Sequence, residues 1–183
     1  MGNEIYLIGI WILLIVILVD AFLLPKKLSA SKRFRANQAK RYLLTFRSIQ
    51  EPSKKFGYLR KVNPYAFEEM INESLKQREL LIKRTQTYSG DGGIDGVFYI
   101  RDQKFFVQAK RYKSHINPEH VNSFKEICKK NKVKGIFVHT GKTGAKSKGI
   151  GNGNICFISG VQLLNLFDGH TVILTFSDQT FSI

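Results

Sequence analysis

The feature that most constrains this chain is the segment from residue 91 to residue 110, which predicts a β-hairpin with polar side chains at one end. Two runs rich in strand-forming residues, 97–100 and 105–109, flank the polar residues 101–104, and this arrangement is typical of a hairpin. With the turn centred between Asp102 and Gln103, three facing pairs are expected: Tyr99 with Phe106, Val97 with Gln108, and Asp95 with Lys110.

The predicted register gathers three polar side chains of different chemistry on one face of the hairpin. Because side chains alternate along a strand, an acid, an amide and an amine share that face. The polar set is Asp95, Gln108 and Lys110, and the opposite, apolar set is Phe105, Val107 and Ala109. Burying polar groups is costly unless they bind something, so this end of the hairpin is predicted to be a functional site. A shift of one residue would separate the three side chains, so the prediction depends on the pairing.

These side chains have the chemistry of a divalent-metal site. Mg²⁺ takes oxygen ligands, keeps several waters and needs only one or two carboxylates. Asp95 and the side-chain oxygen of Gln108 fit this role, and the backbone carbonyl of Ala109 could add a ligand. Lys110 could orient a water and stabilise its hydroxide form or the charge of a transition state. We therefore expect Mg²⁺ as the cofactor, with Mn²⁺ able to replace it.

The charge of the chain favours a polyanionic partner. Its formal net charge is +15, and Lys and Arg side chains bind nucleic-acid phosphates with release of counterions. Residues 141–153 read as a basic loop suited to phosphate contacts. With the basic residues after the hairpin, this loop gives the predicted DNA-binding set: Arg111, Lys113, Lys142, Lys146 and Lys148. The four histidines lack metal-ligand spacing, and none is predicted to be catalytic.

The N-terminal residues predict a membrane anchor. An apolar run from residue 5 to residue 24, interrupted by Asp20, is long enough for a helix across a bilayer core of roughly 30 Å. A cleaved signal peptide is the alternative, although no basic residue precedes the run. Because basic residues follow the run, we expect a single-pass helix in the inner (cytoplasmic) membrane with the C-terminal domain in the cytoplasm. The basic residues would bind membrane lipid or act as a nucleic-acid arm.

The rest of the chain predicts an α/β fold with a mixed central sheet flanked by helices. Helices are expected to start at Asn63-Pro64, with an end near Leu81, and at Asn117-Pro118, because Asn caps helices and Pro suits the first helical position. Later elements are expected at residues 135–140 (strand), 155–158 (strand), 161–167 (helix) and 171–176 (edge strand). The predicted division is 1-25 as the transmembrane anchor, 26-61 as a basic juxtamembrane linker and 62-183 as the domain that carries the site.

Three motifs stand in order along this last domain: Pro64-Tyr65-Ala66-Phe67-Glu68, Ser89-Gly90-Asp91-Gly92-Gly93-Ile94-Asp95 and Gln108-Ala109-Lys110-Arg111-Tyr112. The pattern continues through two later segments, Gly135 to Thr140 and Ile158 to Leu164. The ordered set resembles the Mrr-like restriction endonuclease family of the PD-(D/E)xK nuclease superfamily, over roughly residues 63–167. The resemblance implies a restriction-endonuclease-like αβββαβ core and metal-dependent cleavage of double-stranded DNA.

The resemblance also implies roles for individual residues. Asp95 and Gln108 become metal ligands, Lys110 becomes the catalytic lysine, and Glu68 becomes an acid on a helix that assists the metal site. Spacing alone places Glu68 only at the edge of the buried stripe of its helix. Gln108 stands where the wider superfamily usually has an acid, and this substitution removes a negative charge from the metal site.

Three functions follow from these observations. The first is a DNA endonuclease tethered to the membrane, which would restrict incoming foreign DNA or serve in the transfer of mobile elements. A catalytically inactive DNA-binding or scaffold module on the same fold is the second, since Gln108 could fail to hold metal. The third is a membrane-surface interaction protein, which would leave the polar cluster without a purpose. Because cutting both strands needs two sites, a homodimer is expected for the nuclease.

Overall fold

A mixed sheet of five strands forms the centre of the protein, in a computed structural model that describes residues 11, 30–78, 80–83, 93–151 and 153–183. The strands lie in the order β1 (Leu81–Lys83), β2 (Gly96–Ile100), β3 (Gln103–Lys110), β4 (Lys134–His139) and β5 (Ile155–Ile158). The first three pair antiparallel, whereas β3, β4 and β5 pair parallel. A separate two-stranded sheet contains β6 (Ile173–Thr175) and β7 (Thr180–Ser182).

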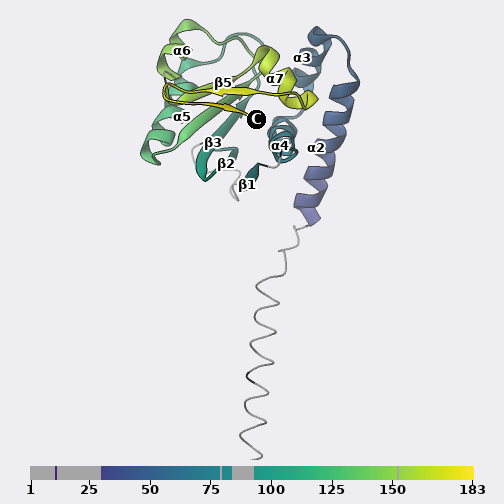
Figure 1. Cartoon of the computed structure of the whole chain (residues 1–183). Helices are drawn as coiled ribbons and strands as arrows, with labels where there is room; N and C mark the ends of the chain where they lie inside the picture. Colours follow the sequence, from purple (N-terminus) through teal and green to yellow (C-terminus); the bar gives the residue numbers. More distant parts are fainter. Residues whose placement is uncertain (1–10, 12–29, 79, 84–92, 152) are drawn as a thin grey trace, which may run out of the picture. The chain divides into compact units, whose positions relative to one another are not determined.

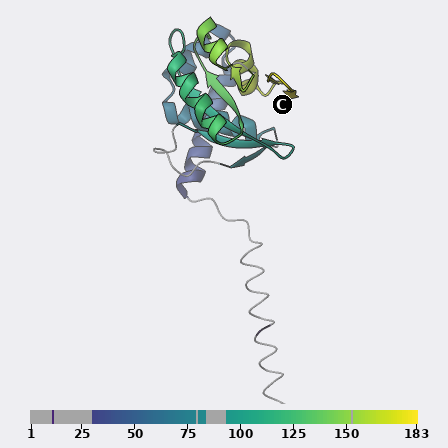
Figure 2. The same ribbon diagram turned by 90° about the vertical axis from the view of Figure 1, so that its left-hand side faces the viewer.

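Helices cover both faces of the five-stranded sheet (Figure 1). They are α2 (Ala30–Ser48), α3 (Pro52–Lys61), α4 (Pro64–Lys76), α5 (Pro118–Lys130), α6 (Ala145–Gly151) and α7 (Gly160–Asp168). In Figure 2, which is seen from the α5 side, the sheet lies behind α5. The order α4-β1-β2-β3-α5-β4 gives the αβββαβ core, so the predicted α/β class with a mixed sheet and flanking helices is confirmed.

Two apolar cores hold these layers together. The larger core lies against one face of the sheet and includes buried residues of α2, α3, α4 and α7. Within it, the Phe167 ring packs edge-on against Phe46 at 5.3 Å and Phe67 at 5.9 Å between centroids. The smaller core lies on the other face, where Phe106 and Phe137 of the sheet pack with Phe124 of α5. Each fully buried Phe contributes about 2 kcal/mol of transfer free energy.

The two Asn-Pro sequences begin helices as predicted. The Asn63 side chain accepts a hydrogen bond from the Tyr65 N–H at 2.9 Å, and Asn117 accepts one from the Glu119 N–H at 2.9 Å. These bonds satisfy donors that the first helical turn leaves without partners. The helix α4 ends at Lys76 and not near Leu81, because Leu81 already pairs with Tyr99 in the sheet.

Residues 30–61 differ from the expected basic linker, because they form α2 and α3 and pack on the larger core. Ala39, Leu43 and Phe46 of α2 and Leu59 of α3 are fully buried there, at 1% exposure or less. The basic residues of α2 lie between these apolar positions, and their number hides the helical period in the sequence. The three-part domain division therefore remains a prediction, although most of its middle segment is folded into helices.

The hairpin forms as predicted, but its register differs by two residues. Val97 pairs with Phe106 and Tyr99 with Lys104, so Gln108 is not the partner of Val97. The cause is the turn, which contains only Arg101 and Asp102, with Arg101 at a φ of 46° in the left-handed region. A displacement of two residues preserves the faces of both strands, and it brings Asp95 opposite Gln108 in place of Lys110.

Two later segments also differ from expectation. The loop expected at residues 141–153 contains the short helix α6. The edge strand expected at residues 171–176 forms β6, which pairs with β7 and not with the central sheet. Phe176 and Phe181 of this hairpin segment lie against Phe105, at 5.6 and 5.4 Å between ring centroids. Covering the aromatic face of β3 is therefore the role of this C-terminal hairpin.

The helices of this structure contradict the predicted location in the inner membrane. Among the described residues, none of the helices combines the length and the apolar character that crossing a bilayer requires. The apolar run predicted to span the membrane, residues 5–24, lies outside the described residues except for Trp11.

Candidate active site

Asp95 is fastened at the start of β2 by hydrogen bonds to two neighbouring elements. Its N–H donates to the Val107 carbonyl at 2.8 Å, and its Oδ2 accepts from the Ala109 N–H at 2.7 Å. From α4, the Asn72 side-chain amide donates to the Asp95 carbonyl at 3.3 Å. Both the backbone and the carboxylate of Asp95 are thereby oriented, and Asp95 bonds to the residues on either side of Gln108.

Gln108 has a buried side-chain amide whose nitrogen is hydrogen-bonded and whose oxygen, in the described part of the chain, is not. The residue is 5% exposed, and its Nε2 donates to the Gly93 carbonyl at 2.8 Å. Among the described residues, no donor reaches the buried Gln108 Oε1. A buried polar oxygen without a partner costs about 1–3 kcal/mol, and a bound ligand could offset this cost. A carbonyl-type oxygen of this kind suits a hard divalent cation.

Gly93 is required for this arrangement. Its φ is +97°, which side chains of L residues rarely adopt, and a Cβ there would lie 2.4 Å from Gln108 Nε2. The glycine therefore permits the close approach of backbone to amide that fixes the orientation of Gln108.

Glu68 of α4 interacts electrostatically with Asp95 and Lys110. The pKa of Glu68 is raised to about 7, chiefly by burial and also by the negative charges of Asp95 and Glu69, whereas Lys110 acts to lower it. These influences place the Glu68 carboxyl close to both Asp95 and Lys110. The structure thus brings the predicted helix acid to the end of the hairpin. A carboxyl with this pKa exchanges a proton near neutral pH.

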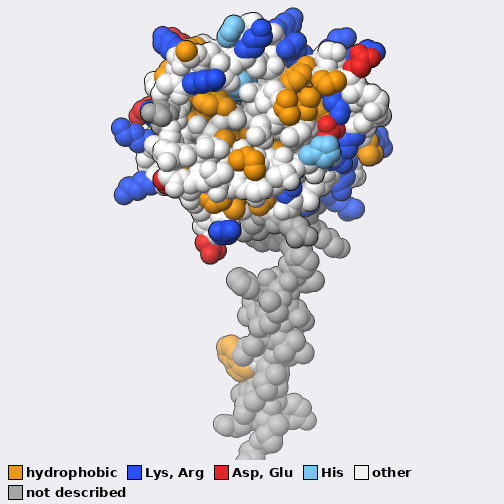
Figure 3. Space-filling model, turned by 45° about the horizontal axis from the view of Figure 1, so that its top comes forward, with side chains coloured by type: hydrophobic (Ala, Val, Ile, Leu, Met, Phe, Trp, Pro, Cys, Tyr) orange, Lys and Arg blue, Asp and Glu red, His pale blue; other side chains and the backbone are white. Residues whose placement is uncertain are grey.

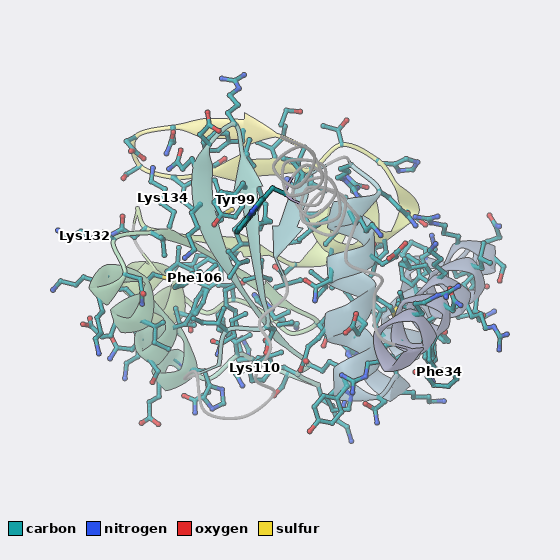
Figure 4. The ribbon with its side chains drawn as sticks, turned by 90° about the horizontal axis from the view of Figure 1, so that it is seen from below. Phe34, Tyr99, Phe106, Lys110, Lys132 and Lys134 are labelled. Carbon is teal, nitrogen blue, oxygen red and sulfur yellow. The ribbon has the colours of Figure 1, made fainter. Side chains whose placement is uncertain are left out.

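Lys110 ends β3 beside a small pocket. The pocket has a volume of about 300 Å³ and is lined by Pro64, Phe67, Glu68, Ala109, Lys110, Arg111, Tyr112 and His120. In Figure 4, Lys110 lies between α4 and α5. Glu68, Ala109 and Lys110 of the predicted site therefore share one surface-accessible hollow.

A larger pocket of about 620 Å³ lies elsewhere, between α2 and α4, and contains none of the predicted site residues. The smaller pocket is lined by three of the predicted site residues, Glu68, Ala109 and Lys110, whereas Asp95 and Gln108 do not line it. In the described part of the chain, no group of three or more His, Cys, Asp and Glu side chains could hold a metal ion. The candidate set contains two carboxylates, supplemented by an amide oxygen and a backbone carbonyl.

The predicted DNA-binding residues differ in how close they lie to the smaller pocket. Arg111 lines the pocket, and its Nη1 donates to the Arg60 carbonyl at 2.9 Å. The chain after β3 is joined to the chain after β4, since the Lys142 N–H donates to Ser114 O at 2.9 Å and the Ile116 N–H to Lys142 O at 3.1 Å. Because β3 and β4 are parallel, both segments leave the sheet at the edge where Lys110 lies.

The other predicted basic residues are solvent-exposed and line neither pocket: Lys113, Lys142, Lys146 and Lys148. Lys146 and Lys148 are on α6. In Figure 3, Lys and Arg side chains predominate over Asp and Glu on the face shown. This surface provides the positive charge that a polyanion requires.

Four residues at the site were not predicted from the sequence: Asn72, Tyr112, His120 and Thr140. Asn72 lies one helical turn after Glu68 on α4, where the sequence pattern predicts a side chain that faces water, but it is buried. Tyr112 lies within the third motif, while His120 follows the second Asn-Pro helix start by two residues. Their contacts come from the meeting of separate elements, which spacing does not show.

One comparison with known proteins identifies a family. A family model described as "Restriction endonuclease", of the Mrr catalytic type, matches residues 59–167. Comparison with curated proteins and with solved structures finds no match. The matched span covers more than half of the chain and includes the helix acid, the hairpin and the pocket. The chain therefore belongs to the Mrr-like restriction endonuclease family and is a nuclease of that type.

Proposed function

We propose that the protein is a metal-dependent endonuclease that hydrolyses phosphodiester bonds of double-stranded DNA, with Mg²⁺ as its cofactor. The observation that carries this proposal is the buried Gln108 Oε1, which no described donor reaches. The residues before and after Gln108 in β3, Val107 and Ala109, both form hydrogen bonds with Asp95. An oriented carboxylate beside an amide oxygen without a donor is an arrangement that a cation would complete.

The donor set fits Mg²⁺. Asp95, Gln108 and Glu68 would hold the ion with side-chain oxygens, and Ala109 with its backbone carbonyl. Mn²⁺, which accepts the same ligands, is expected to replace Mg²⁺. When bound, the ion would supply positive charge that polarises a phosphate oxygen and lowers the pKa of a bound water. The missing acid at position 108 makes the affinity depend strongly on how well Asp95 is held.

Lys110 and Glu68 would act on the water and on the phosphate. The Lys110 ammonium would orient the attacking water and stabilise negative charge on the phosphate in the transition state. Glu68, with a pKa near neutrality, would hold the charged form once a cation lies beside it. Neither role requires movement of the sheet, because β3 and α4 already converge on the same pocket.

DNA binding would extend from the pocket over the basic surface. Arg111, Lys113, Lys142, Lys146 and Lys148 would contact backbone phosphates, which gives affinity without sequence preference. Cutting both strands of a duplex needs two catalytic centres, so the proposed active form is a homodimer. Restriction of incoming foreign DNA is the biological role that we propose for such an enzyme.

The experiment that tests the function is plasmid cleavage by the full chain with Mg²⁺, with Mn²⁺ and with EDTA. The same assay is run with Asp95→Asn and with Asp102→Asn as the matched control, because Asp102 is an exposed acid of the hairpin turn. We expect nicking or linearisation that requires metal and Asp95 and is unchanged in Asp102→Asn.

Failure to cleave either unmodified or methylated plasmid, with the plasmid still retarded on a gel, would sink the proposal. The protein would then be a DNA-binding module that lacks catalysis. Equal cleavage by wild type and Asp95→Asn would show that the active centre lies elsewhere.

A further inference from the structure

Tyr112 and His120 form a pair in the same pocket as Lys110. The Tyr112 hydroxyl lies 2.6 Å from His120 Nδ1, and the two rings are 6.1 Å apart between centroids. Tyr112 leaves the end of β3, whereas His120 is the third residue of α5. Both line the hollow that also contains Glu68 and Lys110. The proposed function gives this pair no role in holding the metal or in activating water.

Tyr112 is held rigidly enough to orient its partner. The buried Thr140 hydroxyl accepts from the Tyr112 N–H at 2.9 Å and donates to the Tyr112 carbonyl at 2.9 Å. On its other side, the Tyr112 ring packs edge-on against His139, 6.4 Å away between centroids. Because the backbone and the ring are both fixed, the Tyr112 hydroxyl is a fixed point for the imidazole of His120. A side chain oriented in this way loses little entropy when it binds a ligand.

The hydrogen bond to Tyr112 decides which ring nitrogen faces outward. With Nδ1 engaged by the Tyr112 hydroxyl, Nε2 is left for a ligand. When the hydroxyl donates to Nδ1, Nε2 carries the proton of the neutral ring, and in the imidazolium both nitrogens carry protons. In both of these forms His120 presents an Nε2–H donor from an exposed position, whereas a neutral ring that donates from Nδ1 to the Tyr112 oxygen would present an acceptor.

The surroundings of His120 favour a phosphate oxygen as acceptor. Lys110 and Arg111 provide positive charge in the same pocket, against the carboxyl of Glu68. His120 lies in the first turn of a 13-residue helix, where the dipole favours an anion. Glu119 is also in that turn, but it is exposed and does not line the pocket.

We propose that His120, oriented by Tyr112, binds a DNA phosphate next to the phosphodiester that is cut. The inference rests on the proposed function, because it takes DNA as the ligand of this pocket. His120 is on this account a substrate-positioning residue that holds the strand against Lys110 and Glu68. Tyr112 acts through His120 and does not contact DNA itself.

The test is binding of a fluorescein-labelled DNA duplex to the full chain in EDTA, where cleavage does not interfere. His120→Ala is expected to weaken binding about five- to tenfold, as loss of one phosphate hydrogen bond implies. Tyr112→Phe is expected to weaken it less, because the imidazole stays but is no longer held. His170→Ala is the matched control, since His170 is exposed and follows α7 outside this pocket.

A ring-nitrogen NMR titration separates a phosphate contact from a structural effect. Adding the duplex is expected to shift the Nε2 resonance of His120 and to leave that of His170 in place. His120→Gln, which keeps a side-chain N–H donor, is expected to recover part of the affinity. With Mg²⁺, His120→Ala should raise KM more than it lowers kcat.

Each outcome has a definite meaning. If wild type binds and cuts DNA while His120→Ala matches it in affinity and KM, the inference is wrong and the nuclease stands. An unmoved His120 resonance in the bound protein would overturn it equally, even if His120→Ala were weakened by misfolding. If wild type does not bind the duplex, both the inference and the proposed function fail.

Discussion

The side-chain amide of Asn72 on α4 donates a hydrogen bond to the backbone carbonyl of Asp95 at 3.3 Å. Asn72 is 6% exposed, and its Oδ1 lies so near the backbone that a Cβ on Gly96 would be 2.6 Å away. The helix that carries Glu68 is thereby coupled to Asp95, the residue that precedes β2. The distance between the two carboxylates of the site depends on this contact.

Asn72→Ala should reduce metal affinity and cleavage together. Removing the donor leaves the Asp95 carbonyl without its partner, at a cost of about 1–3 kcal/mol in the free energy of unfolding. Mn²⁺ titration and urea denaturation measure the two effects. Asn131→Ala is the control, because the Asn131 side chain makes an exposed bond to Ile127 O, far from the site. Wild-type metal affinity in Asn72→Ala would show that α4 does not position Asp95.

Gly93→Ala should disturb Gln108 directly. A methyl group there would lie 2.4 Å from Gln108 Nε2 on a backbone with a φ of +97°, so the amide must rotate or shift. We expect loss of metal binding with a cooperative unfolding transition retained. Gly57→Ala is the opposite case, since nothing lies within 4 Å of a Cβ on Gly57 within α3, and it should stabilise the fold by up to about 1 kcal/mol. A Gly93→Ala protein that binds Mn²⁺ normally would contradict the role given to Gln108.

Glu68 makes the stability of the metal-free protein fall as pH rises. Its pKa in the fold is about 7 instead of 4.5, chiefly because of burial. Between these two values the folded state binds more protons than the unfolded state, so the free energy of unfolding decreases with increasing pH. Glu68→Gln should remove this slope. Urea denaturation in EDTA at several pH values between 4.5 and 8 checks it, and parallel profiles for wild type and Glu68→Gln would refute the assignment.

The ion pair between Lys55 and Asp168 should contribute far more to the free energy of unfolding than the nearby pair between Lys54 and Glu51. Lys55 Nζ lies 2.6 and 2.7 Å from the two Asp168 carboxylate oxygens, and Lys55 is 8% exposed. Lys55→Ala leaves that carboxylate without its partner and should cost about 3 kcal/mol. Lys54→Ala breaks the exposed pair with Glu51 and should cost under about 1 kcal/mol. Equal effects in thermal unfolding would mean that α3 is not docked on α7.

The sequence predicted the hairpin and the chemistry of its end, but not the contacts that hold it. Alternation is a property of one strand, so Asp95 and Gln108 could be assigned to a face without knowing the turn. The register depends on the turn, and the two-residue turn at Arg101 gave no glycine or asparagine signal that would have located it.

Elements whose apolar residues are outnumbered by charges were harder to predict. In α2 the mean hydropathy is low, and only its packing on the larger core, such as Phe46 against Phe167, shows which positions are buried. Asn72 and His120 acquire their contacts from elements that approach from elsewhere in the chain. Such partners are set by tertiary structure, which local spacing does not encode.

The docking of α2 on the core bears on how this nuclease could be joined to other proteins during evolution. The family match begins at residue 59, yet Phe46, fully buried, covers the ring of Phe167 from within α2. A recombination event with its junction at residue 59 would remove the packing of Phe46 on Phe167 and expose apolar surface on the catalytic domain. Gene fusions that preserve a working enzyme should therefore have their junctions ahead of Phe34, where the compact unit begins.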